Sequence, residues 1–139
     1  SNLKVFSRLR VPIVSLVIGE GCSGGALGIG VCDRLLLLQY SYLATISPEG
    51  CASILFKSAS KAELACQSMK ITAPQLLEQK LIDGVINEPL GGAHRDYGSH
   101  FKAVNYRLFE EIDMLKRIPT DKLVQQRFDK IRRYGRFEK

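Results

Sequence analysis

The sequence lacks the patterns that hold a metal ion, cross-link a secreted fold or cross a membrane. Its four cysteines, Cys22, Cys32, Cys51 and Cys66, form no C-x-x-C pair, and only two histidines accompany them. This spacing predicts neither a zinc site nor a disulfide framework, so we expect reduced thiols. No apolar run is long enough to cross a membrane, and no secretory signal is recognisable.

Net charge is absent from most of the chain, and the whole net positive charge lies at one end. Residues 116–139 hold nine Lys and Arg against three Asp and Glu, a balance of +6, while residues 1–115 hold eleven of each sign. No nucleic-acid recognition motif accompanies this charge. Because Leu123, Phe128 and Ile131 form an apolar stripe within it, the tail is predicted to be a helix that contacts a partner rather than nucleic acid.

The remaining pattern is that of one α/β domain, for which 139 residues with 45% hydrophobic content suffice. Consecutive leucines at 35–38 indicate a strand buried on both faces, and strands alternating with helices predict parallel pairing. Strands are expected over 11–18, 33–38, 42–46 and 85–86. Helices are expected over 2–10, 23–30, 51–56, 61–68, 72–80 and 98–117, with a last one opening at Pro119.

Local signals fix some of these helix starts. Ser60 is predicted as an N-cap, with Glu63 completing a capping box, and Thr72 is predicted as the next N-cap. The helix over 98–117 is expected to turn one apolar face to the core. That face comprises Phe101, Val104, Leu108, Ile112 and Leu115.

The stretch from Val11 to Ala26 runs from an apolar strand into a glycine turn and then a helix, and it fits three known patterns. Residues 19–24 fit the dinucleotide fingerprint G-x-G-x-x-G, but the next strand ends in Gln39-Tyr40 without the required acid. Residues 21–25 fit the nucleophile elbow G-x-S-x-G, for which Ser23, Asp83 and His94 would form a hydrolase triad.

The third pattern needs only the main chain. The first N–H groups of a helix have no internal partner, and the helix dipole adds partial positive charge there. The amides of Gly24 and Gly25 would therefore form an oxyanion hole. The structural alternative is a tight turn without a binding role, in which Ser23 serves only as the N-cap of the helix.

Longer motifs resemble one family, the α subunit of the carboxyltransferase of acetyl-CoA carboxylase. They are V-P-I through G-E-G-C-S-G-G-A (11–26), I-S-P-E-G-C-A (46–52), K-I-T-A (70–73), I-D-G-V-I (82–86), E-P-L-G-G-A-H-R-D (88–96) and Q-R-F-D-K-I-R-R-Y-G (126–135). Departures from the family pattern are Leu55-Phe56 in place of Leu-Trp, and Cys22 and Cys32 in place of glycine. The resemblance implies the C-terminal half of that subunit.

The resemblance implies a crotonase-like α/β fold, with a partial carboxyltransferase core over 1–97 and a C-terminal helical segment over 98–139. It implies transfer of a carboxyl group from carboxybiotin to acetyl-CoA to give malonyl-CoA, the first committed step of fatty acid synthesis. Gly24 and Gly25 would form the biotin-side oxyanion hole. The same cleft would be lined by Ser23, Ser47, Pro48, Glu49 and Gly50.

The implied partners are a carboxyltransferase β subunit, a biotin carboxyl carrier protein and acetyl-CoA, in an α2β2 assembly without metal. The implied location is the cytoplasm, or the plastid stroma in a plant or alga. The second oxyanion hole would come from the β subunit, so this chain alone is expected to be inactive. Two alternatives stay open: a serine hydrolase built on Ser23, Asp83 and His94, and a non-enzymatic assembly fragment that binds through its basic tail.

Overall fold

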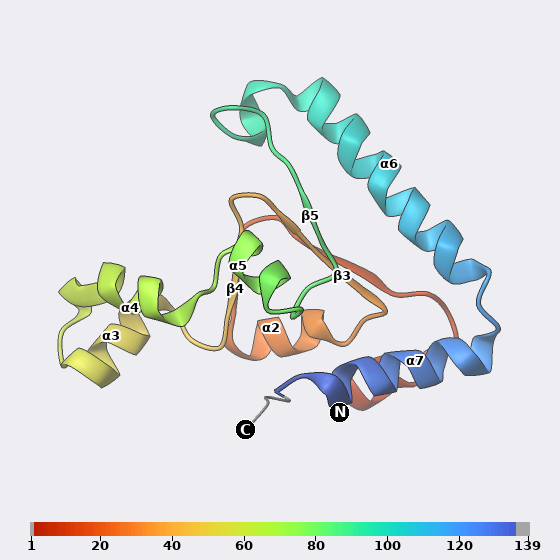
Figure 1. Ribbon diagram of the computed structural model, residues 1–139, viewed down its shortest axis with the longest axis horizontal. Coiled ribbons are helices and arrows are strands. Elements are labelled where there is room, and N and C mark those ends of the chain that lie inside the picture. The colour runs from red at the N-terminus through yellow and green to blue at the C-terminus, as the bar shows by residue number, and fades with distance from the viewer. Residues whose placement is uncertain (1, 136–139) are drawn as a thin grey trace.

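The computed structural model describes residues 2–135, and these form two small parallel sheets surrounded by helices (Figure 1). The strands are β1 (Val14–Val17), β2 (Glu20–Cys22), β3 (Arg34–Leu38), β4 (Tyr42–Ala44) and β5 (Gly84–Ile86). The α-helices are α1 (Asn2–Ser7), α2 (Ser23–Gly30), α3 (Pro48–Phe56), α4 (Ala62–Met69), α5 (Ala73–Glu78), α6 (Tyr97–Lys116) and α7 (Thr120–Arg133). Two short 3₁₀ helices are η1 (Ala59–Lys61) and η2 (Ala93–Arg95).

Strand pairing is parallel throughout, as the alternation of strands and helices predicts. One sheet has the order β1-β3-β5, and the other pairs β2 with β4. β2 was not predicted, because its three residues lie inside the glycine turn and are too few and too polar to show a strand pattern. The chain therefore leaves β1, crosses to a second sheet and only then enters α2.

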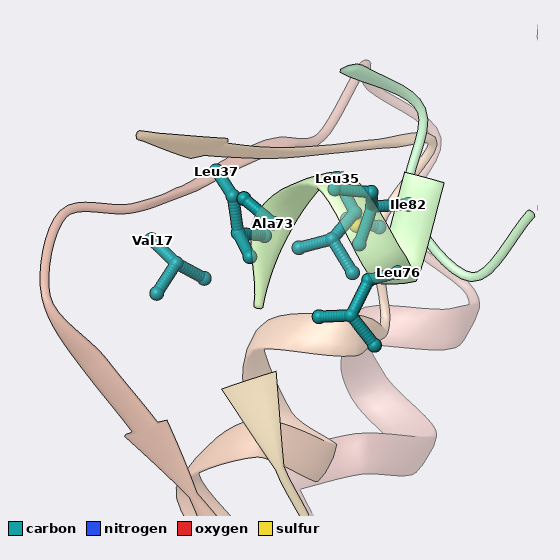
Figure 2. Packing of buried hydrophobic residues seen from close by; sticks show 7 residues of the cluster. Val17, Leu35, Leu37, Ala73, Leu76 and Ile82 are labelled. Atoms are coloured by element: carbon teal, nitrogen blue, oxygen red, sulfur yellow. The ribbon is translucent and has the colours of Figure 1, made fainter. Parts of the chain in front are cut away.

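The leucine run of β3 is buried on both faces, as predicted. Leu35 and Leu37 point to a cluster with Val17, Leu76 and other apolar side chains of α5 and its flanks (Figure 2). The alternate residues, Leu36 and Leu38, pack with Ile86, Val14 and Leu16 of the sheet and with Val104 and Leu108 of α6. Each fully buried leucine contributes about 1.5–3 kcal/mol of hydrophobic stabilisation, so β3 is the centre of the fold.

A buried ion pair joins α7 to the amino end of β3. Arg127 donates to both carboxylate oxygens of Asp33, at 2.9 and 2.7 Å, with both side chains at most 3% exposed. The same guanidinium donates to the main-chain carbonyls of Phe6, Leu9 and Val11 at 2.7–3.1 Å. Every donor direction of the buried cation is thus used, which is the condition for tolerating a charge in the interior.

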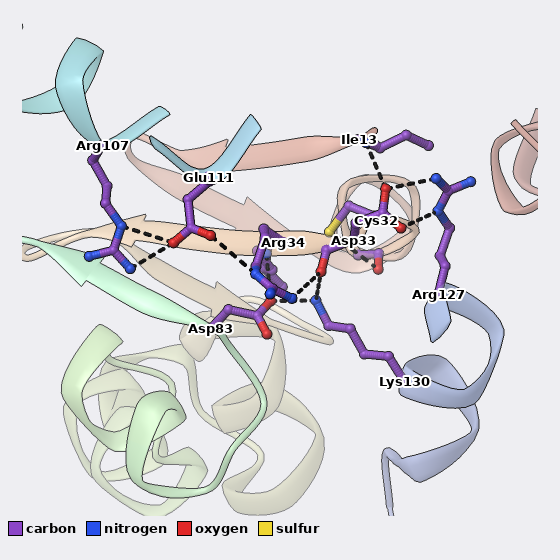
Figure 3. Close-up of polar contacts among 11 residues, drawn as sticks. Ile13, Cys32, Asp33, Arg34, Asp83, Arg107, Glu111, Arg127 and Lys130 are labelled. Carbon is purple, nitrogen blue, oxygen red and sulfur yellow. Dashed lines mark hydrogen bonds and ion pairs between the residues drawn. The ribbon is translucent and has the colours of Figure 1, made fainter. Parts of the chain in front are cut away.

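Two more charge clusters lie at the same end of the sheet (Figure 3). Glu111 of α6 is buried and accepts from Arg34 at 3.1 Å and from Arg107 at 2.9 Å. Asp83, just before β5, accepts from Lys130 of α7. Both long C-terminal helices are therefore tied to the sheet by side chains that pair across 47 to 77 residues of sequence.

Several local predictions need correction. Ser60 is not an N-cap, because α4 begins at Ala62 after η1 and the Ser60 hydroxyl instead pairs with Ser58. The capping box with Glu63 is therefore absent. Thr72 does precede α5, and Gln75 Oε1 accepts from its N–H and its hydroxyl. Phe101 is 69% exposed rather than buried, and the adjacent His100 is the buried residue of this turn of α6.

The division of the chain at residue 97 remains a prediction. The segment from residue 98 onward contains two helices, as predicted. Residues 136–139 of this segment lie outside the described residues. No helix among residues 2–135 combines the length and apolar character needed to span a membrane.

Candidate functional site

The candidate site begins where β2 passes directly into α2. The chain enters α2 from Cys22, which is extended, and the Cys22 side chain makes no capping hydrogen bond. Ser23 is already the first helical residue and is exposed, so the N-cap interpretation of Ser23 is wrong. Its φ of +54° lies in the left-handed region, a conformation that costs a non-glycine residue energy and is found preferentially at functional sites.

Gly24 and Gly25 occupy the first turn of α2, where main-chain N–H groups have no intrahelical acceptor. Both residues are exposed, and nothing lies within 4 Å of the position where a Cβ would project from either one. No side chain among the described residues accepts a hydrogen bond from these amides. The helix entrance is thus open to an oxygen atom that carries negative charge.

The segment Ser47–Gly50 leaves the neighbouring strand at the same edge. β2 and β4 pair in parallel with Cys22 opposite Ala44, so their carboxyl ends lie side by side. The starts of α2 and α3 therefore rise from one edge of the two-stranded sheet, as expected for two segments of one site. This shared edge supports grouping the two segments, while the roles of their residues stay predictions.

The helix α3 begins earlier than the predicted range of 51–56. The helix begins at Pro48 rather than at Cys51, because Ser47 caps it by accepting from the Gly50 N–H at 3.1 Å and proline suits the first helical position. Glu49 is exposed in the first turn. A side chain at Gly50 would approach Ile46 Cγ1 to 2.9 Å, so glycine lets α3 turn closely over the end of β4.

Tyr42 is a neighbour of the site that the sequence analysis missed. Its register partner on β2 is Glu20, and its hydroxyl lies 4.0 Å from the Cys22 Sγ atom, next to the start of α2. Loss of solvent around the phenol raises the pKa of Tyr42 above its ordinary value, with the Cys22 thiol and Glu20 adding to the effect. The phenol is therefore harder to ionise than a free tyrosine, and its oxygen accepts from the Cys22 thiol. Its position depends on β2, which left no sequence signal.

The structure does not support the hydrolase triad. Asp83 lies before β5, where it accepts from the Leu35 N–H at 2.7 Å and pairs with Lys130. Ser23 and His94 instead lie in segments that follow the carboxyl ends of strands, at the opposite edge. Within residues 2–135, no hydrogen bond joins Ser23, Asp83 and His94. A serine nucleophile would therefore have no activating base.

The loop after β5 is fixed at its start and open at its tip. The Glu88 carboxylate accepts from the Tyr40 N–H at 2.9 Å, and the Glu88 N–H donates to Gln39 Oε1 at 3.0 Å. Gly91 has a φ of +91°, and a side chain there would collide with Arg95. The side chains of His94 and Arg95 are exposed and form no hydrogen bond within the described part of the chain.

A hollow of about 1230 Å³ lies at the other end of the sheet and is not the candidate site. Its lining includes Asp33, Asp83, Arg127 and Lys130, whose charges already pair with each other. The charged groups at its centre are thus engaged with one another, whereas Lys80 and Arg133, which also line the hollow, form no ion pair within the described residues. Across the described chain, no three His, Cys, Asp or Glu side chains gather in a way that would hold a metal ion.

Comparison with known proteins identifies the relatives of this chain. The family described as "Acetyl co-enzyme A carboxylase carboxyltransferase-like" matches residues 1–135. An acetyl-coenzyme A carboxylase carboxyl transferase subunit alpha from Francisella tularensis subsp. novicida is 55% identical over 137 residues. The corresponding protein of Francisella philomiragia is 54% identical over 137 residues. Each alignment covers 99% of this chain and 44% of the relative, so the chain spans less than half the length of these relatives.

Two solved structures share the fold. A Pseudomonas malonate decarboxylase hetero-tetramer in complex with coenzyme A superimposes with a TM-score of 0.70 at 17% identity, covering 91% of this chain and 50% of that one. The transcarboxylase 12S hexamer, with methylmalonyl-coenzyme A bound, superimposes with a TM-score of 0.53 at 20% identity, covering 61% and 19%. The expected crotonase-like α/β fold is thereby confirmed.

Proposed function

Because this chain belongs to the acetyl co-enzyme A carboxylase carboxyltransferase-like family, we propose that it is part of an α subunit that transfers a carboxyl group from carboxybiotin to acetyl-CoA. The product would be malonyl-CoA, and the step would belong to fatty acid synthesis. One observation carries the proposal for the site: Gly24 and Gly25 are exposed residues in the first turn of α2, and the Cys22 side chain does not cap that turn. The residues present fit a biotin group, since an oxygen can approach both amides.

Carboxybiotin, delivered on a separate carrier protein, would supply the carboxyl group and leave a ureido oxygen that bears negative charge. The two amides would hold that oxygen by hydrogen bonds, reinforced by the dipole of α2. One such donor is worth about 3–4 kcal/mol in a comparable oxyanion hole. Because main-chain groups supply this stabilisation, the chain needs neither a catalytic serine nor a histidine base for it.

The neighbouring segments would shape the cleft. Ser23 at the helix entrance and Ser47, Pro48, Glu49 and Gly50 at the start of α3 rise from the same sheet edge and would line the biotin-binding side. A second oxyanion hole, for the thioester of acetyl-CoA, would come from a β subunit. The working enzyme would then be an α2β2 assembly that also engages a biotin carboxyl carrier protein, in the cytoplasm or the plastid stroma.

Reconstitution tests the proposal. The full-length subunit containing this sequence, mixed with its β subunit and a carboxybiotin donor, should form malonyl-CoA from acetyl-CoA. This chain alone should form none, because the thioester side is missing. Carboxyl transfer by this chain alone, or no transfer by the complete mixture, would contradict the proposal.

A single substitution separates this function from ester hydrolysis. Ser23→Ala removes the hydroxyl but keeps every main-chain amide, so carboxyl transfer by the complete complex should persist. A serine hydrolase would lose nearly all turnover with the same change. Measuring malonyl-CoA formation and ester hydrolysis on the same preparations decides between the two.

A further inference from the structure

The side chain of Cys22 lies at the position from which a helix start is normally capped. Cys22 is the N-cap residue of α2, with an extended backbone at φ −131° and ψ 155°. A side chain at the N-cap accepts a hydrogen bond from the N–H of the second or third helical residue. In α2 these residues are Gly24 and Gly25. Because sulfur is a weak acceptor, a thiol turned toward these amides would occupy the same donors that an oxyanion needs.

The thiol of Cys22 is engaged by Tyr42 instead. Glu20 and Cys22 are two residues apart on β2, so their side chains point to one face of the two-stranded sheet. Tyr42 is the register partner of Glu20 and shares that face. Its hydroxyl oxygen lies 4.0 Å from Cys22 Sγ and accepts from the thiol. The Cys22 side chain therefore makes no capping hydrogen bond, and the helix entrance stays open.

Main-chain contacts on both sides fix the strand that carries Tyr42. The Tyr42 N–H donates to the Gly19 carbonyl at 3.1 Å, and the Leu43 N–H donates to the Ile71 carbonyl at 3.2 Å. A side chain at Gly21 would approach Leu43 Cδ1 to 2.7 Å, so β2 and β4 lie close together. The position of the phenol relative to Cys22 is thus set by the pairing of two strands.

We propose that Tyr42 is a positioning residue, which keeps the amides of Gly24 and Gly25 available by holding the Cys22 thiol away from them; this inference rests on the proposed function. Tyr42 acts through Cys22 and not on the reacting atoms. Without its hydroxyl, the thiol is released to cap α2. Such a cap stabilises the helix but occupies the donors, so at this position stability and activity oppose each other.

The first test is Tyr42→Phe in the full-length subunit that contains this sequence, assayed with its β subunit. The ring remains and only the acceptor for the thiol is lost. We expect kcat to fall by about three- to fivefold, the effect of one weak hydrogen bond that competes for the amides. KM for acetyl-CoA should not change. Tyr40→Phe is the matched control, because Tyr40 is 60% exposed and its hydroxyl makes no hydrogen bond within the described residues.

Rescue separates a positioning role from a merely structural one. Cys22→Ala removes the thiol, so kcat of this variant should stay within about twofold of the unmodified complex. Adding Cys22→Ala to Tyr42→Phe should restore kcat to the same level, because no side chain is left to cap α2. A structural defect caused by the loss of the hydroxyl would persist in the double variant. Absence of rescue would therefore overturn the inference.

A stronger cap should produce a larger effect of opposite sign on stability. Cys22→Asp introduces one of the best N-cap side chains, and its carboxylate has no proton to donate to Tyr42. We expect kcat to fall by at least about 30-fold, because donors of the hole are occupied and negative charge lies beside it. The melting temperature of the subunit should rise. An unchanged kcat or a lowered melting temperature would contradict the inference, because the side chain at position 22 would then not reach the amides.

Solvent exchange of the two amides tests the inference without an activity assay. In the full-length subunit labelled with ¹⁵N-glycine, Gly24 and Gly25 should exchange at equal rates with and without Cys22→Ala. Tyr42→Phe should slow that exchange by about threefold or more. Slower exchange in the unmodified subunit than in Cys22→Ala would refute the inference, even if the Tyr42 variant does not fold, because the thiol would already cap α2. If exchange follows the expected pattern but the complete complex transfers no carboxyl group, the proposed function fails while the positioning role stands.

Discussion

At the amino ends of the parallel strands the charges are largely buried and paired, whereas at the carboxyl ends Gly24 and Gly25 are exposed at the start of a helix. Asp33 pairs with Arg127 of α7, and Glu111 of α6 pairs with Arg34 of β3. The helix entrance after β2 instead has an exposed, uncapped first turn. One edge of the fold thus uses its polar groups to hold the chain together, and the other keeps its polar groups available.

The same contrast separates the hollow among the paired charges from the candidate site. Volume alone does not make a site, because groups already engaged in ion pairs must break those contacts before they bind a ligand. Free main-chain donors make no such demand. The two edges should therefore respond differently to substitution, with folding affected at one and catalysis at the other.

The largest effect is expected for Arg127→Met. The substitution leaves Asp33 as a buried, unpaired carboxylate and removes donors from three main-chain carbonyls. Breaking a buried pair in this way costs about 3–5 kcal/mol of unfolding free energy. Urea unfolding followed by circular dichroism measures it.

The control for that experiment lies on the same helix. Arg132 is exposed over the Phe128 ring, 5.5 Å from its centroid. Arg132→Met should cost no more than about 1 kcal/mol. Equal losses for the two substitutions would show that the buried pair does not hold the amino end together.

Gly25→Pro tests the other edge. Proline is tolerated in the first turn of a helix but has no N–H, so the fold should persist while one donor is lost. We expect kcat of the complete complex to fall by about 10²–10³-fold. Gly25→Ala keeps the amide and enters open space, so its kcat should stay within about threefold. Similar activity for the proline and alanine variants would argue against an oxyanion hole at this position.

The labelling rates of two native cysteines compare the two ends of the strands without any substitution. Cys32 lies beside the paired charges and is fully buried, and burial raises the pKa of its thiol. Cys22 lies at the helix entrance and is half-buried. Iodoacetamide should label Cys22 well before Cys32 in the folded chain, as mass spectrometry of the peptides would reveal. In urea the two rates should converge, and early labelling of Cys32 would mean that the amino end opens readily.

The smallest effect concerns Asp96, which caps α6 beyond the carboxyl end of β5. Hydrogen bonds from the Ser99 hydroxyl and N–H lower the pKa of the Asp96 carboxyl below 3.8. A lowered pKa means that the carboxylate stabilises the fold above pH 4 and loses that effect as the pH falls through the folded-state value. NMR titration should place the midpoint below 3.8, and Ser99→Ala should raise it. An unchanged midpoint in that variant would remove Ser99 as the cause.

Sequence patterns predicted the core and the helix entrance better than they predicted the charged network. The consecutive leucines of β3 predict burial on both faces of the sheet, and the glycine-rich segment after a strand predicts an uncapped helix start. β2 left no pattern because three residues are too few for a period. Phe101 lies on the predicted apolar face of α6, but His100 is the buried residue in that turn, and the apolar periodicity gives no sign of a buried histidine.

The sequence did contain a signal that Arg127 is buried. It lies four residues after Leu123 and four before Ile131, so it occupies the apolar stripe of α7, where a charged residue is costly unless paired. That position predicts a buried partner. It does not reveal which one, because Asp33 is 94 residues away and pairing at that distance is set by the tertiary fold.

The hydrogen bonds of Arg127 to the N-terminal segment also bear on which residues can vary among related sequences. Its guanidinium holds the carbonyl oxygens of Phe6, Leu9 and Val11, not their side chains. A carbonyl survives almost any replacement of the side chain on its residue. Across related sequences, the arginine and its aspartate should therefore be retained together, while the residues at those three positions drift freely in size and polarity.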